Sequence, residues 1–494
     1  MAAVTREARR LIAGATLAVV PVRHRRGRLV IAAALTAGCL PFGSPTSSAW
    51  ASSCGAPDVT FTATSAVTLA PGVTALAGQA TSAAGPVAVH LIRADLTQTT
   101  LRAVGPGATG AVDAGAAIAA LSHSVAGING DLYHVTPYGT SFAPDGPQAD
   151  QGTLVKAGAG EADAFTVTQG VAEITTPHFE GTVTITEPVP ATSSANLATT
   201  APPTPAPTPK SSAAVHKPTT KKATRHKKKK RKKARRRHRR RHHRVAHPVR
   251  LPPGGIVVGP APPVPPSPGS TPGPAPAAAP SAVVTLDGVN DVDGRTNAVL
   301  VTPAWGKAAP ADEFPAGSVE VMSDGATVTA IRPASQIVKP GAGTVALVLS
   351  DAAARRVPWL AVGDLFAAQT ALTSSRGPVS LAIGGNARLL GADVVDPSCS
   401  LGADTTRRPR VAIGTYAQGN AIVLAVAAGD TSSEPGLTLR ETGSLMRALQ
   451  ADDALNLDGG HSSTLRERFS GSWHEVNNGA ADEPWVANVL AVVA

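Results

Sequence analysis

The sequence predicts an α+β protein that is rich in β-strands, has few helices and is interrupted by a long insertion of Pro, Ala, Lys and Arg. Short apolar stretches with alternating polarity recur on both sides of the insertion, and turn signals such as Asp-Gly separate several of them. Only one amphipathic helix stands out, near the C-terminus. The chain has 494 residues, 43% of them hydrophobic, which is enough apolar surface for a sizeable core.

The first globular part, residues 52–188, is mostly β in pattern. We expect a strand over 87–92, a helix of small residues over 112–122, a hairpin over 165–174 that turns at Gln169-Gly170, and a strand over 181–186. The composition then changes abruptly. Residues 189–281 contain no aromatic side chain, and such a segment cannot bury enough apolar surface to offset its conformational entropy, so we expect it to be disordered.

The second globular part, residues 282–494, resumes with a strand over 282–286. It continues with a hairpin over 319–331 that turns at Asp324-Gly325 and with alternating residues over 411–427 around Gln418-Gly419. The helix is expected over 439–450, because Thr438 and Glu441 form a capping-box signature in front of an apolar face. By themselves these patterns fit either two domains or one domain with an inserted loop, since loop-closure entropy grows only slowly with length.

Residues 1–51 read as a secretory signal peptide. A basic stretch, Arg23–Arg28, precedes the apolar run 29–35, and small residues lead to Ala49-Trp50-Ala51. An uncleaved anchor is the alternative, and a lipoprotein site at Cys39 is disfavoured by Thr36. The mature chain is expected to lack a transmembrane helix and to be secreted or associated with the cell envelope.

Cleavage after Ala51 would leave two cysteines, Cys54 and Cys399. In an oxidising compartment two cysteines favour one disulfide, which would tie the mature N-terminus to the loop around Cys399. Two unrelated thiols are the alternative.

Charge is concentrated in one tract within the insertion. Residues 217–244 hold 18 of the 45 Lys and Arg residues, and outside this tract and the leader the acidic residues outnumber the basic ones. The high overall pI therefore does not describe the globular parts, which disfavours a nucleic-acid-binding fold. Behind a secretory signal, we expect the tract to bind an anionic envelope polymer or lipid surface, or extracellular nucleic acid. A solvated linker is the alternative.

The sharpest local pattern surrounds Asp458. A short apolar strand runs into this carboxylate, then into Gly459-Gly460, His461 and the hydroxyls of Ser462 and Ser463. Glycines let backbone N–H groups approach a ligand closely, and such a turn can bind an anion. Asp-Gly-Gly also occurs in ordinary turns, so further patterns are needed.

Those patterns are Asn129-Gly130-Asp131, which follows an apolar stretch and precedes Leu132-Tyr133, and Arg410, which heads the strand-like segment 409–414. Taken in order with the helix start 436–441, the segment 456–464 and Val486-Ala487-Asn488, they resemble the phosphodiester glycosidase family. The segments 288–290 and 301–306 resemble its middle. The resemblance covers 85–188 and 282–494, and implies one domain interrupted by the insertion.

The chain departs from the family pattern in four places, one of which is Val411 where threonine is usual. His461 replaces a third glycine, Pro484 stands where an arginine is expected, and Ala428-Gly429-Asp430 stands where Asp-Gly-Arg is usual. Two cationic positions would thus be lost, which suggests a different substrate anion.

The resemblance implies hydrolysis of a sugar-1-phosphodiester at its glycosidic bond. The carboxylate of Asp458 is the candidate general base or oxocarbenium stabiliser, Arg410 a bidentate phosphate clamp and His461 a donor or proton shuttle. The substrate would be bound by eight further residues: Asn129, Gly130, Asp131, Gly459, Gly460, Ser462, Ser463 and Asn488.

The sequence leaves alternatives open for single residues, for a metal and for the activity. Arg410 fits half of an ion pair as well as a phosphate clamp, and the helix cap by itself explains Glu441. No His/Cys spacing suggests zinc, so no cofactor is expected, while a divalent cation on Asp side chains is left open. The alternatives in function are a phosphodiesterase that cleaves P–O and a non-catalytic protein that binds envelope polyanions.

Overall fold

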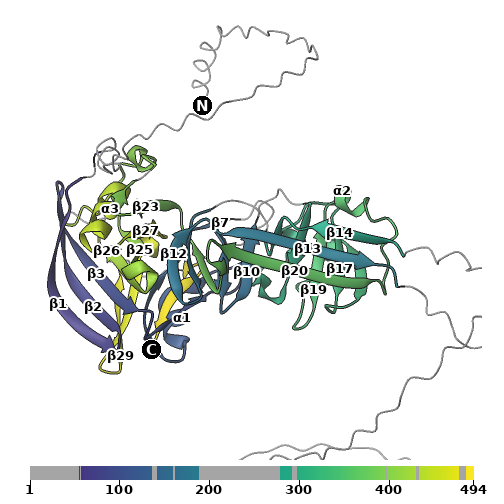
Figure 1. Cartoon of the computed structure of the whole chain (residues 1–494), viewed down its shortest axis with the longest axis horizontal. Coiled ribbons are helices and arrows are strands. Elements are labelled where there is room, and N and C mark those ends of the chain that lie inside the picture. The colour runs from purple at the N-terminus through teal and green to yellow at the C-terminus, as the bar shows by residue number, and fades with distance from the viewer. Residues whose placement is uncertain are drawn as a thin grey trace, which may run out of the picture. The chain divides into compact units, whose positions relative to one another are not determined.

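The computed structural model describes residues 55, 57–135, 142–158, 162–188, 279–291, 297–396, 398–429, 433–477 and 485–494. Within it, Pro57–Ala494 form one compact unit (Figure 1). The predicted signal peptide over 1–51, the basic tract over 217–244 and nearly all of the predicted disordered insertion lie outside the described residues.

The C-terminal α-helix packs against an eight-stranded sheet. Its order is β1 (Thr60–Ala70), β2 (Val73–Ser82), β3 (Gly85–Asp95), β26 (Ala421–Ala427), β25 (Arg410–Tyr416), β27 (Asp453–Asn456), β23 (Ala387–Gly391), β24 (Val394–Val395). The helix α3 (Leu439–Ala448) begins with the predicted capping box, in which the side chains and backbone of Thr438 and Glu441 bond reciprocally. It buries Leu445 and Met446, and its Met446 side chain packs against Gly414 of β25.

A five-stranded sheet pairs the two globular parts directly. Its order is β29 (Ser472–Asn477), β28 (Thr464–Phe469), β6 (Ser124–Asn129), β31 (Val489–Val493), β4 (Thr100–Val104). The predicted helix over 112–122 is shorter than expected: α1 spans Ala114–Ala120. It starts late because β5 (Val112–Asp113) pairs with β30 (Trp485–Val486) and Asp113 then caps the helix.

A ten-stranded sheet has the order β12 (Val171–Thr175), β11 (Ala164–Thr168), β22 (Leu381–Gly384), β9 (Gln148–Asp150), β10 (Thr153–Gly158), β15 (Gly288–Val289), β16 (Ala298–Val301), β19 (Val345–Leu349), β17 (Val319–Ser323), β18 (Val328–Pro333). The turn predicted at Gln169-Gly170 joins β11 to β12, and both residues have positive φ, as a two-residue hairpin turn requires. The short helix α2 (Asp351–Ala354) follows β19.

Two smaller sheets complete the unit. One has the order β14 (Ser281–Thr285), β13 (His178–Thr186), β20 (Leu365–Ser374), β21 (Gly377–Pro378), and the other pairs β7 (Tyr133–Val135) with β8 (Phe142–Pro144). Short 3-10 helices lie at Pro303–Trp305, Pro310–Asp312, Ala334–Gln336, Leu401–Ala403, Ala417–Gly419 and Gly460–Ser462.

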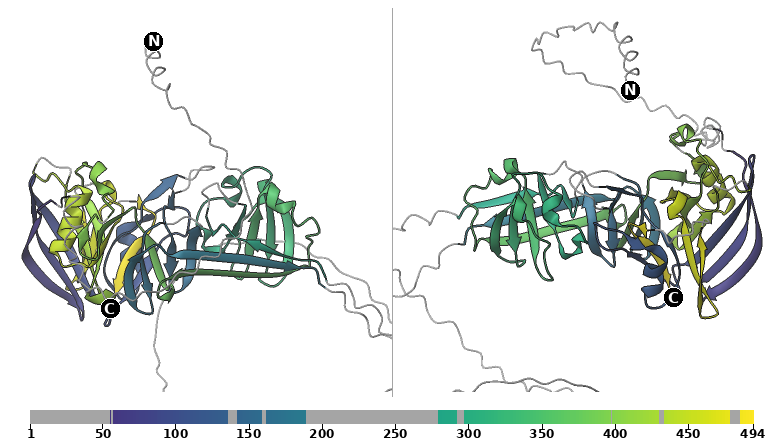
Figure 2. Two further views of the ribbon diagram at one scale, coloured as in Figure 1. Left: turned by 45° about the horizontal axis from the view of Figure 1, so that its top comes forward. Right: turned by 180° about the vertical axis from the view of Figure 1, so that it is seen from behind.

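The two parts of the sequence share their sheets. Strand β13 pairs with β14 although residues 189–278 separate them, and the views in Figures 1 and 2 show the two strands running side by side. Strand β6 likewise pairs with β28 and β31. The predicted β-rich character with few helices is confirmed, and residues on either side of the insertion build common cores.

In the part of the chain that the structure describes, no helix is both long and apolar enough to span a bilayer.

Candidate functional site

Strand ends from distant parts of the sequence meet at Asp458, which follows β27. The side-chain amide of Asn129, at the end of β6, donates to the Asp458 carbonyl at 2.7 Å. The Asp458 N–H donates in turn to the Gly130 carbonyl at 2.9 Å. Asn488, just before β31, accepts from the Asp131 N–H through its Oδ1 at 2.9 Å. The structure therefore brings the first and last parts of the sequence together at this point.

The amide side chains act as scaffold. Asn129 and Asn488 are both 0% exposed. Asn129 Oδ1 also accepts from the Thr464 N–H at 2.9 Å, and Asn488 Nδ2 donates to Gln148 Oε1 at 3.2 Å. Because their polar atoms are committed to protein partners, these two residues hold the Asp458 turn rather than reach toward a substrate. The predicted binding roles of Asn129 and Asn488 thus find no support in their contacts.

Gly130 lets the chain after β6 pack closely against Asn488. A Cβ at this position would lie 2.2 Å from Asn488 Oδ1, so only glycine fits between the two turns.

The Asp458 carboxyl has a raised pKa and one oxygen without a hydrogen-bond partner among the described residues. Burial raises its pKa to about 6, against the opposing effect of hydrogen bonds from the Ser462 side chain and the Gly459 backbone, and the nearby charge of Asp145 raises it further. Its Oδ2 atom is buried and has no hydrogen-bond partner among the described residues. A carboxyl with these properties is mostly ionised at neutral pH and is a stronger base than an exposed aspartate.

A second carboxyl with a raised pKa belongs to Asp131, which follows β6. Asp131 is fully buried, and burial raises its pKa to about 7. The Gly146 N–H donates to its Oδ2 at 2.7 Å, and the charge of Lys156 acts in the same pKa-lowering direction. Lys156 itself is buried, donates to the Pro144 carbonyl and lies 3.7 Å from Asp291. Asp131 therefore holds the turn through Oδ2. Its Oδ1 atom is buried without a hydrogen-bond partner among the described residues, and its predicted contact with substrate stays a prediction.

The hairpin β7–β8 adds three residues that the sequence analysis did not assign to the site. His134 Nδ1 lies 2.7 Å from Asp145 Oδ1 across the hairpin, and the Asp145 N–H donates to the Leu132 carbonyl. The pKa of Tyr133 is raised by burial and by the charge of Asp458. Tyr133 stands in the Asn-Gly-Asp motif, but no local signal links His134 to a partner 11 residues away.

Arg410 is not placed as a phosphate clamp. Its side chain is only 5% exposed. Its guanidinium donates to the carbonyls of Leu437 at 3.0 Å and Thr406 at 2.8 Å, and it pairs with Asp404 at 3.3 Å. These contacts tie the loop before β25 to the start of α3. They match the ion-pair alternative of the sequence analysis.

The turn after Asp458 uses its amides internally. The Gly459 N–H bonds the Asp458 carboxyl, and the Gly460 N–H donates to the Pro409 carbonyl at 3.0 Å. The N–H groups of Ser462 and Ser463 donate to carbonyls within the same turn. These four N–H groups are therefore already used within the protein. The Ser463 hydroxyl is buried without a hydrogen-bond partner among the described residues, so its predicted binding role stays a prediction. His461 is exposed at the outside of this turn, where its predicted role stays untested.

Three further expectations concern the disulfide of Cys399, the role of Glu441 and a metal site. Cys399 is disulfide-bonded, and because Cys54 lies outside the described residues its pairing with Cys399 stays a prediction. Glu441 closes the helix cap and also bonds Arg407 at 2.5 Å, which accounts for its position. No set of three or more His, Cys, Asp or Glu side chains in the described ranges is arranged to hold a metal ion.

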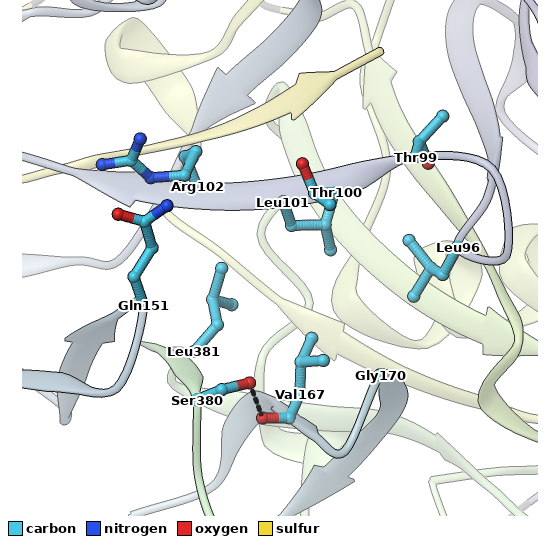
Figure 3. A pocket seen from close by; sticks show the side chains of 10 residues that line it. All are labelled: Leu96, Thr99, Thr100, Leu101, Arg102, Gln151, Val167, Gly170, Ser380 and Leu381. Atoms are coloured by element: carbon cyan, nitrogen blue, oxygen red, sulfur yellow. Dashed lines mark hydrogen bonds between the residues drawn. The ribbon is translucent and has the colours of Figure 1, made fainter. Parts of the chain in front are cut away.

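A cavity of about 280 Å³ lies apart from these residues (Figure 3). Leu101, Val167 and Leu381 turn apolar side chains toward it, and the Ser380 hydroxyl at its edge donates to the Val167 carbonyl at 2.8 Å. The guanidinium of Arg102 at the rim is paired with Asp150 at 2.7 Å. None of the predicted site residues lines this cavity.

Residues 316–493 match the family model described as phosphodiester glycosidase. The resemblance drawn from the motifs at 409–414, 436–441, 456–464 and 486–488 is thereby confirmed. The motif at Asn129 lies outside the matched range. No curated protein matches the sequence.

Two similar solved structures share the fold. A protein from Synechocystis is 15% identical over 89% of this chain and 68% of its own, with a TM-score of 0.56. A Burkholderia pseudomallei protein is 15% identical over 83% of this chain and 74% of its own, with a TM-score of 0.50. The zebrafish N-acetylglucosamine-1-phosphodiester alpha-N-acetylglucosaminidase catalytic domain, auto-inhibited by its pro-peptide, is 12% identical over 88% of both chains. Its TM-score of 0.36 is too low to support a shared fold.

Proposed function

We propose that this protein hydrolyses a sugar-1-phosphodiester at its glycosidic bond and that Asp458 is the catalytic carboxylate. The observation that carries the proposal is the position of Asp458: it lies in the segment matched by the family model, its Oδ2 is buried without a protein partner, and its pKa is raised to about 6. Perturbed carboxyls of this kind are enriched at catalytic sites.

The chemistry fits a single carboxylate of this strength. A phosphomonoester departs as a stable anion, so the reaction needs little proton donation to the leaving group. It needs a base for the attacking water and a negative charge near the anomeric carbon as positive charge develops there. The Asp458 carboxylate can act as this base or as this negative charge, because it is mainly ionised above pH 6.

The direct test is hydrolysis by the full chain of a panel of sugar-1-phosphodiesters in ¹⁸O-labelled water. The proposal expects turnover with the label in the released sugar and a loss of at least ~100-fold in kcat/KM for Asp458→Asn. Label in the phosphate would show P–O cleavage instead. Absence of turnover across the panel would favour a non-catalytic role in binding envelope polyanions.

We further infer, from the sequence of residues 1–51, that the protein is exported, and that the basic tract over 217–244 holds it to an anionic envelope polymer or lipid surface. A polycation gains binding energy by releasing counterions from a polyanion, so this retention should weaken steeply with salt.

Deletion of residues 217–244 tests the tether. We expect the deleted protein to lose its salt-sensitive retention on isolated envelopes while it keeps its turnover of a small soluble substrate. Unchanged retention after the deletion would reject the tether and leave the tract as a linker.

A further inference from the structure

The loop between β22 and β23 places an exposed amide beside the strand that leads to Asp458. Asn386 belongs to this loop and is exposed. Its N–H donates to the Asn456 carbonyl at 3.2 Å, and its Oδ1 accepts from Asn456 Nδ2 at 2.8 Å. A Cβ on the preceding residue, Gly385, would lie 2.5 Å from the Asn456 carbonyl oxygen, so the loop packs closely on β27. The side chain of Asn386 is therefore held in place by two bonds to one residue.

The Asp458 carboxyl lies on the same face of this strand as Asn456. The two residues are two positions apart, and between them the Leu457 N–H still bonds the Val411 carbonyl of β25 at 2.9 Å. Leu455 and Leu457 are both 0% exposed and belong to one core cluster. Because side chains alternate along an extended strand, Asn456 and Asp458 point away from that core, about 7 Å apart along the chain. The exposed amide thus borders the proposed catalytic carboxylate.

Asn386 and Asn456, the amide pair, leave one donor group and one acceptor atom for a ligand. Asn386 Oδ1 is bonded to Asn456, and no described residue accepts from the Asn386 Nδ2 group at the exposed end of the side chain. Asn456 Oδ1 is buried and has no hydrogen-bond partner in the described ranges. A ligand group that suits both must accept one hydrogen bond and offer a proton of its own. A hydroxyl does this, whereas an ionised phosphoryl oxygen can only accept.

We propose that the amide pair binds a hydroxyl group of the substrate's sugar: Asn386 Nδ2 donates to the hydroxyl oxygen, and the hydroxyl proton turns toward Asn456 Oδ1. This inference rests on the proposed function, which supplies the sugar. A hexose extends several ångströms from its anomeric carbon, so Asp458 faces that carbon while the amide pair holds a hydroxyl elsewhere on the ring. An unpaired buried acceptor is costly, and a sugar proton directed toward it lowers that cost. The amide pair therefore selects sugars that carry a hydroxyl at this position.

The experiment measures binding by calorimetry in the full chain with Asp458→Asn, which prevents turnover. The probes are methyl phosphodiesters of glucose-, galactose-, mannose- and N-acetylglucosamine-1-phosphate. To this background we add either Asn386→Ala or the control Asn420→Ala. Asn420 is also exposed, and its Nδ2 bonds the Ala417 carbonyl at 3.1 Å. It follows the far end of β25, Tyr416, and so lies roughly 20 Å from the end that meets Asp458.

We expect at least one diester to bind, Asn386→Ala to weaken its binding roughly fivefold, as for loss of one uncharged hydrogen bond, and Asn420→Ala to leave it unchanged. Analogues of this diester that each lack one sugar hydroxyl then identify the contact. One analogue should bind equally well to the background protein and to Asn386→Ala, because the group that the amide binds is missing. The other analogues should keep the fivefold difference. Circular dichroism confirms that each variant is folded.

The proposal is overturned if no diester binds, if Asn386→Ala leaves affinity unchanged, or if Asn420→Ala weakens binding equally. It is also overturned if every analogue keeps the full fivefold difference, because Asn386 would then act on the phosphate or on the fold and not on a hydroxyl.

Hydrolysis of the same diesters by the wild-type chain separates the two proposals. Binding that depends on Asn386 and on one hydroxyl, together with no hydrolysis, would sink the proposed function and keep the sugar site. Hydrolysis with binding independent of Asn386 would do the opposite.

Discussion

At the scale of single residues, the two buried carboxyls Asp458 and Asp131 differ in what surrounds them. Asp458 lies at a turn whose outer side is open, since a Cβ on Gly460 would meet no atom within 4 Å. Asp131 packs closely against Gly146 and Gly384, where an added Cβ would lie 3.3 Å and 2.4 Å from its Oδ2 atom. The same physical cause, burial, raises both pKa values, and the open outer side of its turn is the reason that we propose Asp458 as the catalytic carboxylate.

Asp131 should make the stability of the protein pH-dependent. Its folded pKa of about 7 lies above the unfolded value of 3.8, so its contribution to stability is fully present below pH 3.8 and is lost as the pH rises through 7. Asp131→Asn mimics the protonated form. We expect the variant to gain stability relative to wild type between pH 4 and 8, by up to roughly 4 kcal/mol.

Urea unfolding at several pH values measures this difference. A constant difference between Asp131→Asn and wild type across the range would show that Asp131 does not titrate near neutrality.

At the scale of elements, the turns and helix caps that depend only on neighbouring residues could be predicted from the sequence. The turn at Gln169-Gly170 and the capping box at Thr438 and Glu441 depend on residues within a few positions, and both occur as predicted. The late start of α1 could not be foreseen, because the strand that competes for Val112 and Asp113 is paired with β30 near the other end of the chain.

The same distinction applies to the site. Asn129, Asp458 and Asn488 could be grouped because the motifs that contain them resemble, in order, segments of the phosphodiester glycosidase family. The backbone contacts of Arg410 and of the Gly460 N–H could not be predicted, because the carbonyls that they bond are placed by tertiary structure. His134 and Asp145 meet only because the β7–β8 hairpin brings them together.

The contact between β22 and the β7–β8 hairpin gives a test at this scale. In Gly384→Ala the new Cβ would lie 2.4 Å from Asp131 Oδ2 and 2.6 Å from the Gly146 Cα, so the base of the hairpin must move. We expect a loss of about 1–3 kcal/mol in stability together with reduced activity.

Gly341→Ala is the matched control, because nothing lies within 4 Å of its Cβ and its φ is not in the left-handed region. Equal stability of the two variants in thermal unfolding would contradict the close packing of the hairpin against β22.

At the scale of the whole molecule, the two parts of the sequence fold as one unit through shared sheets. Thr186 of β13 is opposite Ser281 of β14, and their hydroxyls are 3.1 Å apart. The Glu187 N–H donates to the Pro280 carbonyl at 3.0 Å. The ends that flank residues 189–278 are thus close enough for a short turn to join them.

Replacement of residues 189–278 by a four-residue Gly/Asn turn should therefore leave the fold and the turnover of a small substrate intact. A shorter loop costs less closure entropy, so we expect a stability equal to wild type or higher by roughly 3 kcal/mol at most. Thermal unfolding measures it. A protein that no longer folds would show that the replaced segment contributes to the core.

The pH dependence of kcat/KM tests the assignment of Asp458 most directly. With a sugar-1-phosphodiester that the protein turns over, kcat/KM should fall about tenfold per pH unit below pH 6, because the carboxylate that serves as base becomes protonated. Asp458→Asn should lose at least ~100-fold in activity and show no such limb. A wild-type profile that is flat between pH 5 and 7, or an Asp458→Asn variant that keeps its activity, would contradict the account.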